Sequence, residues 1–387
     1  MSFQKKTYTS LLFLILIVFY GCSSSNSKNE PSLNTLTIPF NEAVEKINFS
    51  ELIDTSVVVI PLESDLSKGA FLNTINQLEI KGEEIYALDY LFNPTVQVFD
   101  RSGKFLRKIG KQGQAPGEYL QPMGFLFSKD TLEVLDAGKI LKFDLNGNFL
   151  TSSRYEGFTA SSFRKTDEGY AFITSGADED NLVLTDNKLS KVSSHFPYKT
   201  RALNPILLNP IYSNPKGNII YRRNLIDTLF ELSDTKIPKP YLAFDYGEKK
   251  VNLNQLLASD NPERTIQDEI GKYAKTLYFF EGNNYYYLAF VLESEIWIMI
   301  KSNISGKSVL FKNSNMNNDV MVDQYSFLVG VSGDTFYFIS KPERIIPSFL
   351  PTTVPSAFES HKKKLEELVK KLDREGNPVL FGVKFNF

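Results

Sequence analysis

The chain has 387 residues, with 43 basic and 45 acidic side chains, two histidines and one cysteine. A net charge of −2 provides no basic field for a nucleic acid backbone, and a single cysteine excludes an intrachain disulfide or a thiolate zinc cluster. Two histidines cannot form a histidine-rich metal centre, and 42% of the residues are apolar, so we expect a large packed core and no cofactor.

The first 21 residues have the features of a secretory signal. Two lysines precede an apolar run over residues 11–20, which is too short to span a bilayer as a helix. A glycine and Cys22 follow at once, and this pattern resembles the lipobox of bacterial lipoproteins, in which the cysteine carries the lipid. We therefore predict a signal peptide over residues 1–21 and lipidation of Cys22. The alternative is an ordinary signal peptide with an incidental cysteine.

The next segment, residues 22–36, is predicted to be a flexible tether. Residues 23–31 are too polar to fold on their own, and such a segment separates a lipid anchor from a folded domain. By resemblance to lipoprotein sorting, Ser23 favours the outer membrane. We expect an outer-membrane lipoprotein of the cell envelope, facing either the periplasm or the surface.

Residues 37–350 contain repeated strand-and-turn segments. Asp100 and Asp144 are 44 residues apart, and each begins an Asp-x-x-Gly turn that follows two apolar segments of the same type and order. Asp186 marks a weaker third copy, and three further units follow at similar spacing. Periods of about 40–50 residues with several short strands are typical of propeller blades. The sequence predicts an all-β fold, a six-bladed β-propeller that is closed by a strand near residues 57–62.

Two segments break the strand pattern. Residues 253–275 have helix-compatible spacing and predict a helical insertion in the fifth unit. Residues 356–375 predict a helix that begins with a serine–glutamate capping box, and the alternating apolar residues 379–387 predict a strand. We expect this C-terminal helix and strand, residues 351–387, to be appended to the outside of the propeller.

Acidic residues end equivalent strands of two successive units. Asp89, with the neighbouring Tyr90, and Asp136 could therefore lie near one rim of a central channel, where two carboxylates would bind a cation or a polar ligand. Aspartates at strand ends also cap turns, and this alternative stays open. Neither histidine lies in a recognisable nucleophile–acid pattern, so we assign no catalytic residue and no metal site.

Aromatic side chains provide a second set of candidate ligand-binding residues. Tyr286 and Trp297 belong to aromatic-rich segments of the kind that sugars and peptides contact, although packing between blades is an alternative. Arg222 and its neighbour Arg223 are expected in an exposed charged turn. Thr131 and Thr228 lie in Asp-Thr-Leu triplets that resemble O-glycosylation acceptors of Bacteroidetes, but such triplets also begin strands.

Several of these segments carry a family resemblance. Residues 60–63, 85–89, 99–106, 109–119 and 377–378 look like the six-bladed β-propeller lipoproteins abundant in Bacteroidetes, and the glycine-rich segment 109–119 is similar to NHL-type propeller repeats. One departure is Ala115, where the similar sequences have glycine. The resemblance implies an exported, lipid-anchored propeller and implies no catalytic set.

We expect a binding or scaffolding module at the cell envelope, without a nucleic acid partner. Its ligand or partner could be a glycan, a peptide or an envelope protein, and propellers offer a preformed central funnel for such a role. One alternative is a hydrolase or lyase that uses channel carboxylates such as Asp89 and Asp136. Another is a structural subunit of an outer-membrane complex.

Overall fold

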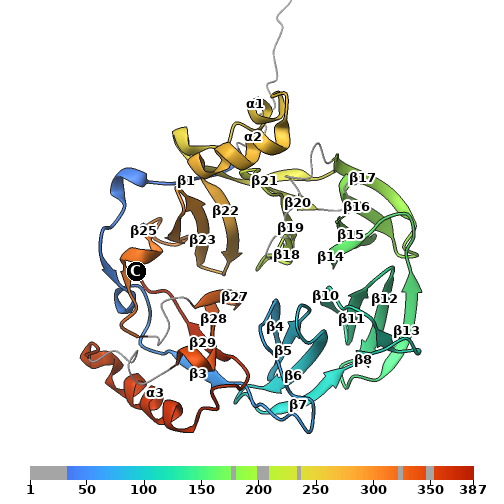
Figure 1. Cartoon of the computed structure of the whole chain (residues 1–387), viewed down its shortest axis with the longest axis horizontal. Coiled ribbons are helices and arrows are strands. Elements are labelled where there is room, and N and C mark those ends of the chain that lie inside the picture. The colour runs from blue at the N-terminus through green and yellow to red at the C-terminus, as the bar shows by residue number, and fades with distance from the viewer. Residues whose placement is uncertain (1–32, 176–179, 198–208, 233–236, 321–325, 346–352) are drawn as a thin grey trace, which may run out of the picture. The chain divides into compact units, whose positions relative to one another are not determined.

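Six sheets stand around a common centre in the unit formed by residues Asn34–Phe387, as the blades of a six-bladed β-propeller (Figure 1). The structure is a computed structural model that describes residues 33–175, 180–197, 209–232, 237–320, 326–345 and 353–387. The predicted fold class is therefore confirmed. The predicted signal peptide and Cys22 lie outside the described residues.

Each blade has four antiparallel strands, and in blades 1 to 5 they follow the chain from the centre outward, whereas in blade 6 the order from the centre is β27, β28, β29 and β3 (Figure 1). Blades 1 and 2 consist of β4 (Gln77–Lys81), β5 (Glu84–Asp89), β6 (Thr95–Asp100), β7 (Phe105–Ile109), β10 (Gly124–Ser128), β11 (Thr131–Asp136), β12 (Lys139–Asp144) and β13 (Phe149–Arg154). Blades 3 and 4 consist of β14 (Ala160–Lys165), β15 (Gly169–Thr174), β16 (Asp180–Asp186), β17 (Lys191–Pro197), β18 (Ile211–Ser213), β19 (Ile219–Arg222), β20 (Thr228–Leu232) and β21 (Lys239–Asp245). Blades 5 and 6 consist of β22 (Lys275–Glu281), β23 (Tyr285–Leu292), β24 (Glu295–Ser302), β25 (Ser308–Lys312), β27 (Phe327–Ser332), β28 (Thr335–Ser340), β29 (Val379–Val383) and β3 (Val58–Pro61).

The Asp-x-x-Gly repeats form the turns between the outer two strands of a blade, as predicted. In blade 1, the Asp100 side chain accepts the backbone amides of Ser102 and Lys104, at 2.8 and 3.0 Å. Gly103 adopts a φ of +89°, a region that only glycine enters without strain. Local turn chemistry therefore fixes the register of these strands.

The sixth blade closes the ring with strands from both ends of the chain. β29 pairs with β28 on one side and with β3 on the other, so the N-terminal strand β3 completes the blade as predicted. The prediction that the C-terminal strand is appended outside the propeller is wrong. All five residues of β29 are buried because they are covered on both faces and paired along both edges.

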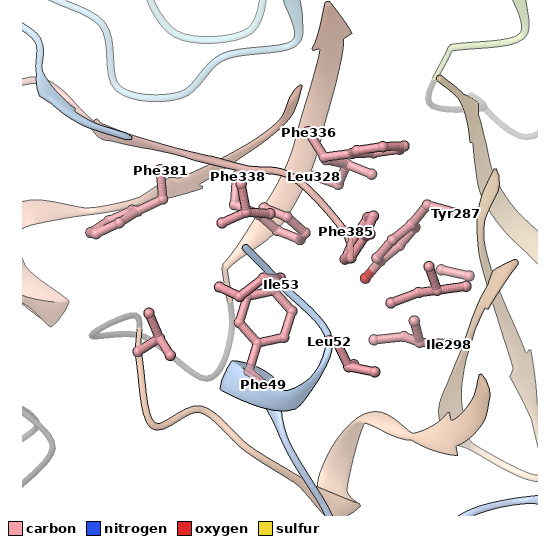
Figure 2. Close-up of a cluster of buried hydrophobic side chains, with 14 of the residues drawn as sticks. Phe49, Leu52, Ile53, Tyr287, Ile298, Leu328, Phe336, Phe338, Phe381 and Phe385 are labelled. Atoms are coloured by element: carbon pink, nitrogen blue, oxygen red, sulfur yellow. The ribbon is translucent and has the colours of Figure 1, made fainter. Parts of the chain in front are cut away.

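An N-terminal strap, residues 34–61, runs along the outside of blades 4, 5 and 6. β1 (Asn34–Thr37) adds a parallel strand to the outer edge of blade 4, and β2 (Ile47–Asn48) pairs with β26 (Met316–Asn317). The predicted tether thus ends earlier than residue 36, because Asn34 already pairs with Leu242. Figure 2 shows Phe49 of the strap packed among the buried side chains of blades 5 and 6.

Short connections and helices complete the fold. The glycine-rich segment after blade 1 forms the small parallel pair β8 (Lys111–Gln112) and β9 (Glu118–Tyr119), which leads into blade 2. The predicted insertion forms α1 (Leu253–Leu257) and α2 (Pro262–Glu269), which lie between blades 4 and 5 and pack on Leu225.

The C-terminal helix α3 (Glu359–Lys371) is shorter than predicted. A 3-10 turn, Ser356–Phe358, precedes it, and no side chain caps its first turn, so the predicted capping box is wrong. Its apolar stripe packs on the core through the buried Leu365. No helix in the part of the chain that the structure describes is long and apolar enough to cross a membrane.

Asp227, which begins the second Asp-Thr-Leu triplet, makes stability depend on pH. The residue is 6% exposed, and burial raises the pKa of its carboxyl group from 3.8 to about 7, although Lys250 Nζ lies 4.0 Å away. Folding therefore favours the protonated form, and stability falls as the pH rises from 3.8 to 7. Since one pKa unit corresponds to about 1.4 kcal/mol, the penalty reaches about 4 kcal/mol above pH 7.

We expect Asp227→Asn to stabilise the protein at pH 8 and to have a progressively smaller effect as the pH falls toward 4. Asparagine cannot ionise and so avoids the cost of a buried charge. Urea unfolding followed by circular dichroism at pH 5 and pH 8 measures this difference. If Asp227→Asn changed the free energy of unfolding by the same amount at both pH values, the pKa of Asp227 would not be raised by folding.

Candidate functional site

The inner strands of all six blades surround a central cavity of about 410 Å³. Its lining includes residues of β4, β10, β14, β18, β22 and β27, the strands nearest the centre in Figure 1. This volume falls in the range of about 300–1,000 Å³ that is usual for small-molecule sites. The lining mixes amide, hydroxyl and charged groups with apolar side chains, so the channel is not filled by apolar side chains alone.

An ion pair links two blades that are not neighbours. Arg164 of blade 3 places Nη2 at 3.6 Å from Oε1 of Glu79 in blade 1, and its Nη1 donates to the carbonyl of Phe163 at 2.9 Å. Burial lowers the pKa of Arg164, and the charge of Glu79 opposes this effect. Both side chains line the cavity, so the pair reaches past the inner strand of blade 2.

Arg222 joins blades 4 and 5 at the rim where the inner strands begin. Its Nη1 and Nη2 donate to the carbonyls of Thr276 and Leu277, at 3.1 and 2.8 Å. The residue is 1% exposed, and burial lowers its pKa to about 10. The prediction of an exposed turn is therefore wrong for Arg222. Its buried guanidinium donates hydrogen bonds to two backbone carbonyls that would otherwise be buried without a partner.

Two side-chain oxygens of cavity-lining residues are buried away from the cavity and have no hydrogen-bond partner among the described residues. They are the hydroxyl of Tyr212, on β18, and Oε2 of Glu281, at the end of β22. The other carboxyl oxygen of Glu281 accepts the hydroxyl of Tyr241 at 2.7 Å. Burial raises the pKa of Glu281, and that hydrogen bond opposes the shift.

Burial and nearby charges shift the pKa of Tyr212. Burial raises it, the negative charge of Glu281 raises it further, and the positive charge of Arg222 lowers it. Arg222 binds carbonyls near the start of β22 and Glu281 ends that strand, so the two charged groups belong to different levels of the channel wall.

The two aspartates predicted from the sequence accept hydrogen bonds from backbone amides. Asp89 is buried, and its Oδ2 accepts the amide of Asn73 at 2.9 Å while its Oδ1 accepts that of Phe92 at 2.9 Å. Asp136 is also buried and accepts the amides of Leu120 and Gln121, at 3.0 and 2.7 Å. Neither lines the cavity. Their geometry is that of the turn caps that the sequence left as the alternative.

The aromatic candidates are divided between the channel and the outer surface. Tyr90 lines the cavity. Tyr286 does not, although it pairs across the sheet with Glu281, and its ring lies 5.3 Å from that of Phe279. Trp297 lies on the outer side of blade 5, where its ring packs against Phe40 of the strap at a centroid distance of 5.7 Å. Packing therefore accounts for Trp297.

The sequence analysis did not find the residues of the channel wall between blades 4 and 5. Tyr212 and Glu281 were not singled out, and Arg222 was placed on the surface. A usable signal was their position: Tyr212 lies in the inner strand β18, Arg222 ends the second strand β19, and Glu281 ends the inner strand β22, in units where the repeat is weakest. Neither Thr131 nor Thr228 is fully exposed, and the Thr131 hydroxyl donates to the carbonyl of Ser128 at 2.7 Å.

A family model described as "Domain of unknown function (DUF4934)" matches residues 35–384. The chain belongs to the DUF4934 family. The matched region begins with β1 and includes β29, so the family spans the strap and the closing strands as well as the blades. A search of curated proteins found no match to this DUF4934 chain.

One solved structure supports the fold of this DUF4934 protein. A Bacteroides fragilis protein, named as a "putative exported protein", is 16% identical, with a TM-score of 0.70 over 91% of this chain and 99% of that chain. A virginiamycin B lyase from Staphylococcus aureus is 10% identical, with a TM-score of 0.41 over 73% of this chain and 81% of the lyase. A protein of unknown function from Bacteroides caccae is 14% identical, with a TM-score of 0.40 over 62% of this chain and 81% of that chain. The last two scores are too low to carry an argument.

Proposed function

We propose that this DUF4934 protein is an exported, lipid-anchored binding module of the cell envelope that holds a small ligand in its central channel. The observation that carries the binding role is the central cavity of about 410 Å³, whose lining mixes amide, hydroxyl and charged groups with apolar side chains. Scaffolding within an envelope complex is the second candidate.

Export and lipid anchoring rest on the N-terminal sequence. The apolar run over residues 11–20 and the glycine before Cys22 support both steps, and the name of the Bacteroides fragilis protein agrees with export. Lipid modification, the outer-membrane location and the likeness to NHL-type repeats remain predictions from the sequence. The catalytic alternative loses the support of Asp89 and Asp136, because both carboxylates bind backbone amides.

The binding role predicts that filling the channel abolishes ligand binding. Ser162 lines the cavity on β14, and we expect Ser162→Trp to remove binding of any ligand that enters the channel, because the indole occupies part of a 410 Å³ space. Ser152→Trp on the exposed outer strand β13 is the matched control. A thermal-shift screen with sugars, peptides and small metabolites identifies a ligand, and calorimetry compares the variants. Equal binding by both variants would place the ligand outside the channel.

If Cys22 carries a lipid anchor, removing it should change the cell fraction in which the protein is found. In a bacterial host that processes lipoproteins, Cys22→Ser should abolish palmitate labelling and move the protein from the membrane fraction to the soluble envelope fraction. Ser27→Ala, in the same segment, should leave both unchanged. If the wild-type protein takes up no label and Cys22→Ser stays in the membrane fraction, the lipid anchor is wrong.

A further inference from the structure

Arg164 is a largely buried cation of the channel wall, and most of its donors are unused. It lies on β14 in the cavity lining, and its side chain is 11% exposed. A guanidinium carries five N–H donors in one plane. Within the described part of the chain its one hydrogen bond runs from Nη1 to the carbonyl of Phe163, at 2.9 Å. Nη2 lies 3.6 Å from Oε1 of Glu79, which is an ion pair but too long for a hydrogen bond.

The unused edge of this guanidinium, Nε and Nη2, is accessible. Neither atom makes a hydrogen bond with the described residues, and neither is among their polar atoms that are buried without a partner. Both atoms therefore keep accessible surface. Phe163 packs in the core between blades 2 and 3, and alternate residues of a strand point to opposite faces, so Arg164 and Ser162 point away from that core. Both residues line the cavity, so the unused edge opens into the channel.

The other two cations of the lining are directed elsewhere. The charged side chains of the lining are Glu79, Arg164, Lys165, Arg222 and Glu281. Arg222 donates to carbonyls near the start of the inner strand β22, whereas Arg164 is the next-to-last residue of the inner strand β14, so the two guanidinium groups lie at different levels. Nζ of Lys165 donates to the hydroxyl of Tyr170, which donates in turn to Glu133 of blade 2.

The two carboxyl groups of the lining act on Arg164 unequally. The charge of Glu79 raises the pKa of Arg164, whereas burial lowers it. Oε1 of Glu281 accepts the hydroxyl of Tyr241 at 2.7 Å, and Oε2 is buried away from the cavity. Burial also raises the pKa of Glu281, which favours its uncharged form. Glu79 is therefore the carboxylate that Arg164 meets across the channel, through one long contact.

A carboxylate from outside the protein fits this guanidinium better than Glu79 does. It can accept two parallel hydrogen bonds from Nε and Nη2, and such charge-assisted pairs are stronger than ordinary hydrogen bonds. It replaces Glu79 charge for charge, and the side chain of Glu79 is 40% exposed, so that it remains hydrated after it is displaced. A doubly charged phosphate would add a second negative charge beside Glu79 in a partly buried wall. The wall therefore favours a carboxylate over a phosphate.

We propose that the channel binds a small molecule with a carboxylate group, which accepts hydrogen bonds from Nε and Nη2 of Arg164 and takes the place of Glu79. This inference rests on the proposed function of the channel. It adds the chemical class of the ligand and the residue that recognises it. It assigns Glu79 the role of an internal carboxylate that competes with the ligand for Arg164.

The test measures binding to the mature full chain by calorimetry. The panel contains uronic acids, hydroxy acids and N-acetyl amino acids, each beside its neutral amide, and glucose 6-phosphate beside glucose. We expect at least one acid to bind, and its amide to bind at least tenfold more weakly. Arg164→Gln should weaken the acid by tenfold or more, which is about the loss of one charge-assisted hydrogen bond. Glu79→Gln should strengthen it, by up to about fivefold, because the competing carboxylate is gone.

The opposite signs of these two effects separate binding from support of the fold, since breaking a purely structural ion pair from either side would harm the protein in the same direction. Arg107 and Glu84 are the matched control. They form an ion pair of 2.7 Å, Arg107 also donates to the carbonyl of Leu145, and neither lines the cavity. Arg107→Gln and Glu84→Gln should leave the affinity unchanged. The melting temperature of each variant without ligand identifies a folding defect.

The outcomes distinguish this inference from the proposed function. It is overturned if no acid binds more tightly than its amide, if Arg164→Gln leaves the affinity intact, or if Glu79→Gln weakens binding. Preference for glucose 6-phosphate over every carboxylic acid overturns the carboxylate class. Binding of a neutral molecule in place of the acids, lost in Ser162→Trp, overturns the inference and leaves the proposed function standing. If Ser162→Trp alters no binding, both fail.

Discussion

Replacing Phe381 with alanine should destabilise the whole propeller by about 3–5 kcal/mol, the usual cost of removing a fully buried phenylalanine. Phe381 is 0% exposed and lies in β29, paired with Phe338 of β28 on one side and with Val59 of β3 on the other. It belongs to the cluster in Figure 2, which also holds Phe49 of the strap. Its loss therefore weakens three segments that are distant in sequence.

The measurement is urea unfolding followed by circular dichroism, with Phe92→Ala as the control. Phe92 is 66% exposed in a loop of blade 1, so its truncation should change the unfolding free energy by less than about 0.5 kcal/mol. If the C-terminal strand were an outer appendage, as the sequence analysis expected, Phe381→Ala would also have a small effect. A difference of less than about 1 kcal/mol between the two variants would contradict the closure that the structure shows.

Local chemistry explains how much of the fold could be predicted. Each Asp-x-x-Gly turn is held by hydrogen bonds to its own aspartate side chain and by the positive φ of its own glycine. A single copy can therefore be recognised from a few consecutive residues. The place of β29 between β28 and β3 has no such local signal. Val58–Pro61 pairs with Val379–Val383 across more than 300 residues, and α3 intervenes between β28 and β29. A pattern of apolar residues identifies such a strand but not its neighbours.

The same reasoning explains why the first candidate site was misplaced. Asp89 and Asp136 were candidates because they recur at equivalent positions of blades 1 and 2, and such recurrence marks a task that these two blades share. Each fixes the loop before the first strand of its own blade. Tyr212 and Glu281 each come from a single blade, and their place in the cavity lining identifies them. That place depends on how the blades assemble around the centre, which no local sequence pattern records.

Replacing Gly103 with alanine should weaken the closing strand much more than the same change at Gly82. Both glycines lie in blade 1 with positive φ, of +89° and +57°, so both substitutions carry a backbone cost of about 1–2 kcal/mol. At Gly82 nothing lies within 4 Å of the added methyl group. At Gly103 that group would stand 2.1 Å from the carbonyl oxygen of Pro61, the last residue of β3. The contact forces the turn and the strand apart.

The backbone hydrogen bond from Glu63 to the carbonyl of Gly103, at 2.8 Å, would be lost with that separation, so we expect Gly103→Ala to cost at least about 2 kcal/mol more than Gly82→Ala. Urea unfolding gives the difference in stability, and hydrogen exchange shows where it arises. The amides of β3 and of its partner β29 should exchange faster in Gly103→Ala, whereas those of blade 3 should not, because the clash acts only where the two ends of the chain meet. Equal stability of the two variants would mean that the Asp100–Gly103 turn does not hold β3 in place. The ring would then depend on β29 alone for its closure.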